Sequence, residues 1–200
     1  RYIAVTGVQT CALPISQSGR AHIYGPDMVR FPDRSGKNLV LAPTHEEAMV
    51  DLVKSVVTSY RELPVFLFQF QSKFRNEDRT RGGLIRTREF VMKDGYSFHR
   101  SFTELNNFFP RVFQAYSRIF EQCRIPAISA EASVGMMMGD RSFEFLMPSP
   151  YGDDSVIRCN SCGYAANAEV AVGDLDRPTE ELEAVVQAET GDAQIGRAHV

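Results

Sequence analysis

Two polar runs joined by a glycine-bearing turn carry residue types that could bind a nucleotide. The first run ends in Arg75 and Glu77, and the second contains Arg86 and Phe90. This pattern predicts two strands of an antiparallel hairpin. A guanidinium binds phosphate oxygens through paired hydrogen bonds, an aromatic ring stacks on a base, and a carboxylate accepts a hydrogen bond from an exocyclic amine. On adjacent strands these four side chains would suit ATP.

Aromatic and polar residues alternate along the first predicted strand. Because side chains on a strand alternate between its two faces, the phenylalanines can face a core while the polar residues share the opposite face. The first set is Phe66, Phe68, Phe70 and Phe74, and the second is Gln69, Gln71, Lys73, Arg75 and Glu77.

The hairpin is basic, whereas the rest of the chain is acidic. Residues 73–100 hold eight Lys or Arg against four Asp or Glu, a net charge of +4, and the remainder carries −7. This contrast indicates a focused anion site rather than a general nucleic-acid surface. The alternative is an exposed hairpin whose charges pair with one another, with Arg75 held by Glu77, and spacing alone leaves both interpretations open.

Three separated motifs resemble those of one enzyme family. Arg75-x-Glu77, a loop and then Arg86-x-x-x-Phe90 resemble motif 2 of the class II aminoacyl-tRNA synthetases. Residues 86–99 are similar to the bacterial-type prolyl-tRNA synthetases, and residues 43–47 and 159–167 resemble two further signatures of these enzymes. The similarity extends from residue 17 to residue 172. Three motifs in the right order are a far more specific signal than one short pattern.

The resemblance implies a ligase that uses ATP to activate L-proline as prolyl-adenylate and then transfers the prolyl group to the 3′ end of tRNA(Pro) for translation. It implies Mg²⁺ at the phosphates, a homodimer and a cytoplasmic location. By the same resemblance Arg75 would be catalytic, contacting the α-phosphate and the carboxylate of proline. Glu77 would bind the adenine amino group, Phe90 would stack on the ring, Arg86 would reach the terminal phosphates, and Thr87 would bond near the nucleotide.

Thr44 and Glu46 match the Thr-x-Glu pair that holds proline in these enzymes. A carboxylate suits the cationic secondary amine, and a hydroxyl can fix its orientation. Thr44 with Glu47 also has the spacing of a capping box for the helix that follows, and the two roles can coexist. His45 either faces solvent or packs, and it receives no role.

Two other functions remain as alternatives. The first is a synthetase for threonine, serine or glycine, against which Thr44-x-Glu46 and residues 159–167 argue. The second is a non-catalytic, synthetase-like binding module. The sequence departs from the family pattern at Ala21, at Met138-Gly139 and at residues 142–145, and these departures affect details of the substrate pocket.

Cys159 and Cys162 have the spacing of metal ligands, but tetrahedral zinc takes four ligands. Cys123 is the only other credible thiol, so we predict a turn that carries thiols without a metal. The same few thiols favour a reducing compartment over a disulfide framework. Met136, Met137 and Met138 are expected to fill a core or a turn.

The two ends are expected to be non-native. Residues 5–15 can be encoded by a nucleotide sequence whose reverse complement encodes residues 195–200, as in a sequencing adapter. We therefore assign residues 17–172 to a partial catalytic core, residues 173–194 to an acidic linker or the start of an inserted editing domain, and residues 1–16 and 195–200 to adapter-like ends. Without motifs 1 and 3, which the resemblance places outside this span, the chain alone is expected to be inactive.

The surrounding pattern predicts an α+β fold, a mainly antiparallel sheet with flanking helices. Helical periodicity is expected from residue 44 to residue 63 and again after a Ser101–Glu104 capping box, with Pro110 causing a kink or a late start. Strands are expected at residues 38–42, 125–133, 142–147 and 156–158. No apolar run reaches membrane length.

Overall fold

The computed structural model of the chain describes residues 2–4, 12–135, 139–150, 152, 154–173 and 186–187. These residues form two compact units, residues 1–107 and residues 108–200. Helices combine with sheets in which most neighbouring strands are antiparallel, so the predicted α+β class is confirmed. In the described part of the chain, no helix is both long enough and apolar enough to cross a membrane.

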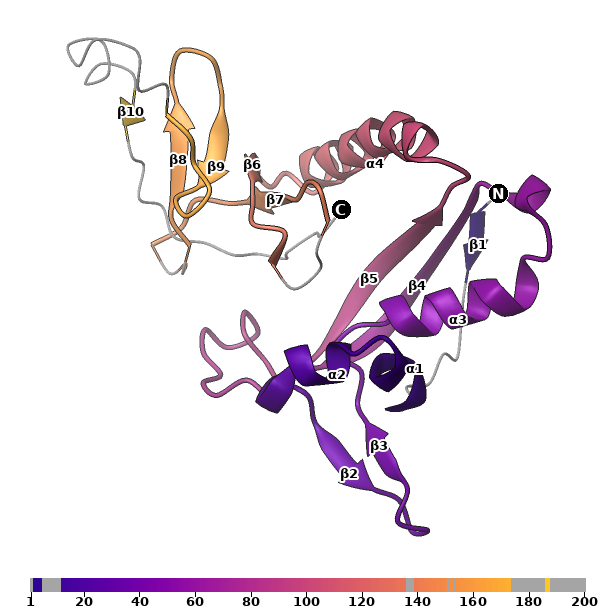
Figure 1. The fold of residues 1–200 in the computed structure, drawn as a ribbon. Coiled ribbons are helices and arrows are strands. Elements are labelled where there is room, and N and C mark those ends of the chain that lie inside the picture. The colour runs from indigo at the N-terminus through magenta and orange to yellow at the C-terminus, as the bar shows by residue number, and fades with distance from the viewer. Residues whose placement is uncertain are drawn as a thin grey trace. The chain divides into compact units, whose positions relative to one another are not determined.

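The first unit is built on the predicted hairpin. Strand β4 (Val65–Phe74) pairs with β5 (Glu89–Phe98) in antiparallel register along their whole length, and β1 (Tyr2–Ala4) joins β4 in parallel (Figure 1). The hairpin is therefore confirmed. Arg75, Glu77 and Arg86 fall just beyond the paired strands, in the connection between them, rather than inside the ladder.

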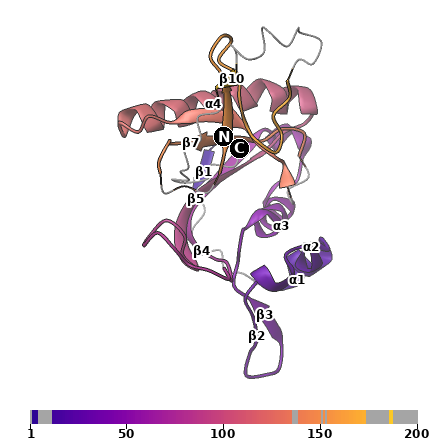
Figure 2. The ribbon, with the colours of Figure 1, turned by 90° about the vertical axis from the view of Figure 1, so that its left-hand side faces the viewer.

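Helix α3 (Glu46–Val56) covers one face of the β4–β5 pair (Figure 1). Its Met49 is fully buried against Val65 and Leu67, and these residues form one of the buried apolar clusters of this unit. The predicted helix is present but ends at Val56, seven residues before the expected end at residue 63. A separate hairpin extends away from the sheet (Figure 2). The remaining elements of the unit are α1 (Ala12–Gln17), α2 (Arg20–Ile23), η1 (Gly25–Asp27), β2 (Arg30–Pro32), β3 (Asn38–Val40) and η2 (Tyr60–Glu62).

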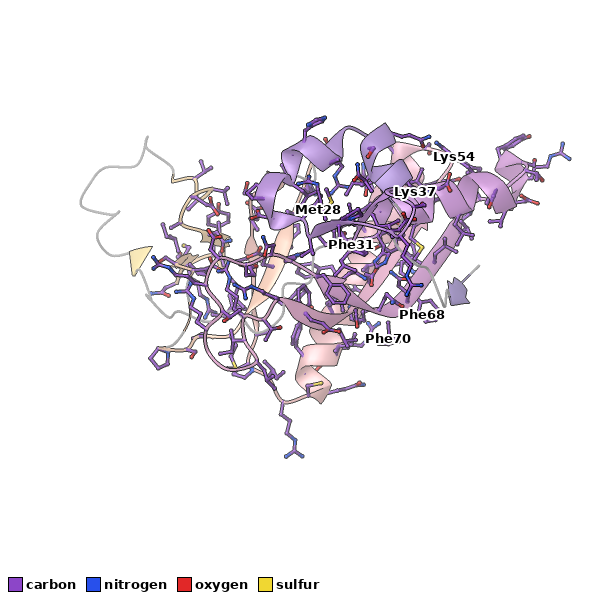
Figure 3. The ribbon with its side chains drawn as sticks, turned by 90° about the horizontal axis from the view of Figure 1, so that it is seen from below. Met28, Phe31, Lys37, Lys54, Phe68 and Phe70 are labelled. Carbon is purple, nitrogen blue, oxygen red and sulfur yellow. The ribbon has the colours of Figure 1, made fainter. Side chains whose placement is uncertain are left out.

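The prediction that the phenylalanines of β4 face the core is wrong for this unit. Phe68 and Phe70 lie on the face away from α3, and Phe70 is 70% exposed (Figure 3). The buried face carries the odd-numbered residues: Val65, Leu67, Gln69 and Lys73. Val65 and Leu67 supply its apolar half, and the polar half can be buried because its side chains hydrogen-bond to β5.

The second unit contains a five-stranded sheet in the order β10-β8-β9-β6-β7, in which only the β6–β9 pair is parallel. Aromatic residues of α4 (Phe102–Gln122) stack on β7, with Phe113, Tyr116 and Phe120 each 5.2–5.6 Å from the Phe145 ring. The predicted strands of this region are confirmed. The elements are β6 (Ile128–Glu131), β7 (Phe143–Leu146), β8 (Val156–Cys159), β9 (Ala165–Asn167) and β10 (Val186–Gln187).

Helix α4 begins as predicted and shows a defined end. The Ser101 hydroxyl accepts a hydrogen bond from the Glu104 N–H at 3.3 Å, while the Glu104 carboxylate accepts one from the Arg100 N–H. The helix starts at Phe102 and continues through Pro110, so the late start is wrong. At its end Arg124 has φ 55°, the Ile125 N–H donates to the Phe120 carbonyl, and the Arg124 N–H donates to the Glu121 carbonyl. This is a Schellman motif.

Three predictions concern residues outside the described part. Residues 136–138, most of residues 173–194 and residues 195–200 are not described, so the turn-filling methionines, the linker or editing domain and the non-native C-terminal end stay predictions. The non-native N-terminal end, residues 1–16, also stays a prediction.

Arg124→Gly should raise the free energy of unfolding by about 0.5–1 kcal/mol, because glycine takes the left-handed conformation of this helix end without the steric cost of a Cβ atom. The matched control is Arg118→Gly, an exposed position inside α4, which should lower it by about 1 kcal/mol. Urea denaturation measures both. Destabilisation by both substitutions would contradict the helix end described here.

Candidate nucleotide and amino-acid site

Arg75 and Phe90 meet at the end of the β4–β5 pair where residues 75–88 connect the two strands. The register places Phe90 opposite Lys73, on the face covered by α3. The backbone N–H of Arg75 donates to the Arg88 carbonyl at 2.9 Å, and its guanidinium carbon lies 5.3 Å from the centroid of the Phe90 ring. The cation and the ring that were predicted to share a ligand thus lie together.

Glu77 and Arg86 form an ion pair across the connection. The Arg86 Nη2 and Nε atoms lie 2.8 and 2.9 Å from Glu77 Oε2. The Arg88 Nε atom donates to the Glu77 carbonyl at 3.0 Å. Glu77 therefore pairs with Arg86 rather than with Arg75. The alternative interpretation is wrong in its choice of partner for Arg75, but two charges of the hairpin do pair with each other, as that interpretation expects. For both side chains to bind a nucleotide, this ion pair would have to break, so that Glu77 could accept from the adenine amine and Arg86 could bind the phosphates.

The Thr87 hydroxyl is already engaged in a hydrogen bond to the backbone two residues further along the chain. The hydroxyl donates to the Glu89 carbonyl at 2.6 Å, where it helps to lead the chain into β5. A bond from this hydroxyl to a nucleotide would require that contact to break.

The segment that carries Thr44 and Glu46 is fixed beside Arg75. The Phe74 N–H donates to the Ala42 carbonyl at 2.8 Å, and the Arg75 Nε atom donates to the Pro43 carbonyl at 3.4 Å. The predicted amino-acid pair and the predicted phosphate-binding arginine, about thirty residues apart in the sequence, are therefore brought to one place.

Thr44 does not cap α3, so the predicted capping box with Glu47 is wrong. The N-cap residue is His45, which makes no side-chain cap bond, and the Thr44 hydroxyl instead donates to the Glu46 carboxylate. Glu47 accepts from Ser18 and forms an ion pair with Arg20 at 2.9 Å. Because the helix starts one residue later than the box requires, Thr44 stays available to Glu46.

A second set of polar residues lies under this segment and was not predicted as a site. Lys73 is fully buried, and its Nζ atom lies 2.9 Å from the Asp94 carboxylate. The Gln69 amide donates to the same carboxylate at 2.8 Å, and the Tyr96 hydroxyl donates to it as well. Burial lowers the pKa of Lys73, against the opposing effect of Asp94, and burial with the Asp94 bond raises the pKa of Tyr96. The sequence did contain a signal for this set: Lys73 has the same odd-numbered spacing along β4 as Val65 and Leu67, so its side chain lies on the same face of the strand.

His45 packs inside the unit, which is one of its two expected placements. The side chain is 2% exposed, and burial together with the nearby Lys73 ammonium lowers its pKa to about 4. The imidazole is therefore neutral near pH 7.

The Cys159–Cys162 turn is held by hydrogen bonds between its own residues. The Cys162 N–H donates to the Cys159 Sγ atom at 3.5 Å, and the Gly163 N–H donates to the Cys159 carbonyl at 3.0 Å. Among the described residues there is no group of three or more His, Cys, Asp or Glu that could hold a metal ion. The absence of zinc stays a prediction.

Comparison with known proteins identifies the family to which this chain belongs. Residues 29–198 match the family described as the tRNA synthetase class II core domain (G, H, P, S and T), and the chain belongs to that family. The predicted class II catalytic core is thereby confirmed.

Among individual proteins, the chain is similar to proline–tRNA ligases. It is 47% identical over 167 residues to that of Aquifex aeolicus, covering 84% of this chain and 29% of the relative. It is 44% identical over 171 residues to that of Caldicellulosiruptor saccharolyticus, covering 86% and 30%. It is 45% identical over 172 residues to that of Salinispora tropica, covering 82% and 29%. The chain thus spans about three tenths of the length of these relatives.

The buried neutral His45 predicts a pH dependence of stability. Its pKa in the folded chain, about 4, lies below the unfolded value of 6.5, so the unfolded chain binds the proton more readily and stability falls as the pH drops below 6.5. Between pH 6.5 and about pH 5 the loss should be about 1.5 kcal/mol in the free energy of unfolding.

Urea denaturation at several pH values measures this dependence. His45→Gln should abolish it over the same range, and His22→Gln, at an exposed position, should leave it unchanged. An unaltered pH dependence in His45→Gln would assign the effect to another group.

Proposed function

We propose that the protein to which this chain belongs is a proline–tRNA ligase. It activates L-proline with ATP, forming prolyl-adenylate and pyrophosphate, and then transfers the prolyl group to the 3′ end of tRNA(Pro). The observation that carries the proposal is the placement of Thr44 and Glu46 beside Arg75, through the Arg75–Pro43 contact. The identity of 44–47% to proteins named proline–tRNA ligase supports the choice of amino acid.

In this proposal Glu46 and Arg75 hold the two ends of proline. The Glu46 carboxylate pairs with the cationic secondary amine and the Thr44 hydroxyl orients it, while the Arg75 guanidinium binds the carboxylate. An oxygen of that carboxylate attacks the α-phosphorus of ATP, and pyrophosphate leaves. Arg75 also offsets the charge on the α-phosphate, so catalysis consists of positioning and charge stabilisation rather than covalent chemistry on the protein.

The nucleotide would lie against the end of β5. Phe90 stacks on adenine, Glu77 accepts from the adenine amino group, and Arg86 reaches the terminal phosphates, which requires the present Glu77–Arg86 pair to separate. Because Arg75 lies over the Phe90 ring, adenine uses the other face of the ring or displaces the guanidinium. Thr87 supplies a weaker contact. Mg²⁺ would neutralise phosphate charge, and the described residues offer no acidic cluster, so we assign it no protein ligand.

The remaining assignments follow from this activity. The proposed partners are L-proline, ATP and tRNA(Pro), the protein acts as a homodimer, and it works in the cytoplasm in translation. The family description spans five amino-acid specificities, so the choice of proline over threonine, serine, glycine or histidine depends on the similarity to proline–tRNA ligases and on Thr44 and Glu46.

A non-hydrolysable prolyl-adenylate analogue, with a sulfamoyl group in place of the phosphate, should stabilise the chain. At about one hundred times its dissociation constant it should raise the melting temperature by roughly 5–10 °C, because it binds only the folded state. The threonyl, seryl and glycyl analogues should have far smaller effects. Thermal-shift titration measures all four.

Glu46→Gln should remove most of the shift caused by the prolyl analogue and leave the shift caused by ATP unchanged. Glu121→Gln, at an exposed position of α4, is the control and should change neither. Equal shifts with all four analogues would support the binding-module alternative instead. A larger shift with the threonyl, seryl or glycyl analogue would reassign the specificity.

A further inference from the structure

Arg20 lies beside the carboxylate that is proposed to bind the amine of proline. Its Nη1 atom is 3.6 Å from Glu46 Oε2, the same oxygen that accepts the hydrogen bond from the Thr44 hydroxyl. The same Nη1 atom lies closer to the neighbouring carboxylate, 2.9 Å from Glu47 Oε1. One guanidinium thus contacts two adjacent carboxylates, and an amine bound at Glu46 would have to share that carboxylate with it.

Two further side chains fix this arrangement. The Arg20 Nη2 atom donates to the Tyr24 hydroxyl at 2.9 Å, and the guanidinium carbon lies 5.3 Å from the centroid of the Tyr24 ring. Tyr24 is itself 6% exposed, in an apolar cluster that includes Met28. The Ser18 hydroxyl donates to Glu47 Oε1 at 3.1 Å, so the closer partner of the guanidinium is also held. Arg20 is therefore anchored by a buried ring and a fixed carboxylate.

The segment that carries Arg20 is also tied to the other end of the proposed site. Asn76, the residue after Arg75, donates through its side-chain amide to the Pro26 carbonyl at 3.0 Å. Its backbone N–H donates to the Asp27 carbonyl at 2.9 Å. Residues 18–27 are thus bonded both to the start of α3 and to the end of β4, and the position of Arg20 is set from both sides.

The two carboxylates differ in their access to a ligand. The side chain of Glu46 is 30% exposed, whereas those of Glu47 and Arg20 are 10% and 13% exposed. The three charges sum to −1, so the pairing of Arg20 with Glu47 leaves one negative charge, which lies on the more exposed carboxylate. A ligand group with a single positive charge, such as a secondary ammonium, would balance it.

We propose that Arg20 is a positioning residue that controls how far the Glu46 carboxylate is available to the amine of the amino acid. Held by Glu47 and Tyr24, the guanidinium leaves Glu46 to the ligand. Released from either one, it pairs with Glu46 and competes with the amine, and the apparent affinity falls with the fraction of molecules that can bind. This inference rests on the proposed function, which assigns the amine to Glu46.

A double-substitution cycle tests the hold on Arg20 without any ligand. Glu47→Gln should lower the melting temperature of the whole chain by about 3 °C, the shift expected for the loss of one partly buried ion pair. In the Arg20→Met chain the same substitution should no longer lower it, because its partner is already absent. Asp51→Asn, at an exposed position of α3, is the control and should change neither chain. Equal losses from Glu47→Gln in both chains would overturn the inference.

Two ligands isolate the contribution of the amine. Prolyl-sulfamoyl-adenosine carries the secondary ammonium, and the same compound with a cyclopentane ring in place of the pyrrolidine lacks it. In Glu47→Gln the affinity for the prolyl compound, measured by calorimetry, should fall about tenfold, which corresponds to Arg20 pairing with Glu46 in about nine of ten molecules. The affinity for the cyclopentyl compound should change less than about twofold. Combining Arg20→Met with Glu47→Gln removes the competitor and should restore the prolyl affinity to within about threefold of the unmodified chain.

Tyr24→Phe separates competition by Arg20 from a general effect of charge. It removes the hydroxyl that accepts from Arg20, keeps the buried ring and alters no charge. The affinity for the prolyl compound should fall about threefold, and that for the cyclopentyl compound should stay unchanged. Asp51→Asn makes the same change of charge as Glu47→Gln on the same helix and should leave both affinities unchanged.

Three results would overturn the inference: equal losses for the two compounds, no recovery when Arg20→Met is added, or an unchanged prolyl affinity in both Glu47→Gln and Tyr24→Phe. An unmodified chain that does not prefer the prolyl compound over the cyclopentyl compound would instead contradict the proposed assignment of the amine to Glu46. The melting cycle would then still decide whether Glu47 holds Arg20.

Discussion

The antiparallel register of β4 and β5 is the constraint on which the rest of the first unit depends. By placing Lys73 opposite Phe90 and Gln69 opposite Asp94, it decides at once which side chains are buried together and where the chain leaves the sheet. A shift by one residue would move every side chain to the other face. It would separate Arg75 from Phe90 and Lys73 from Asp94. The candidate site is therefore a property of the pairing rather than of any single residue.

The buried face of this ribbon is divided along its length into two parts with different roles. Near Val65 and Leu67 it is apolar, and Met49 of α3 packs there, so this end stabilises the unit through burial of apolar surface. Toward the end that carries the connection between the strands, the same face holds Lys73 and Asp94, which are costly to bury but form directional bonds. Hydrogen bonds fix positions more narrowly than apolar contacts do, and this directional end is the one that adjoins the proposed ligand-binding segment.

Alternation and turn residues were sufficient to predict the hairpin, and motif spacing was sufficient to predict the family. The buried face of β4 was predicted incorrectly, because four phenylalanines outweighed Val65 and Leu67 in a judgement that depends on where α3 packs. The Lys73–Asp94 pair was missed because its members are 21 residues apart and meet only through the strand register. The proposed roles of Arg75 and Phe90 came from their residue types and from the resemblance, and their contact came from the structure.

The central claim is that the β4–β5 pair presents a nucleotide site on one of its faces. The affinity of two leucine variants for ATP, measured by calorimetry, tests this claim most directly. Phe90→Leu should weaken binding about tenfold, as expected for the loss of one base–ring stack. Phe70→Leu, on the opposite face and 70% exposed, should bind ATP as the unmodified chain does. Equal affinities for all three proteins would contradict the claim, and so would a loss confined to Phe70→Leu.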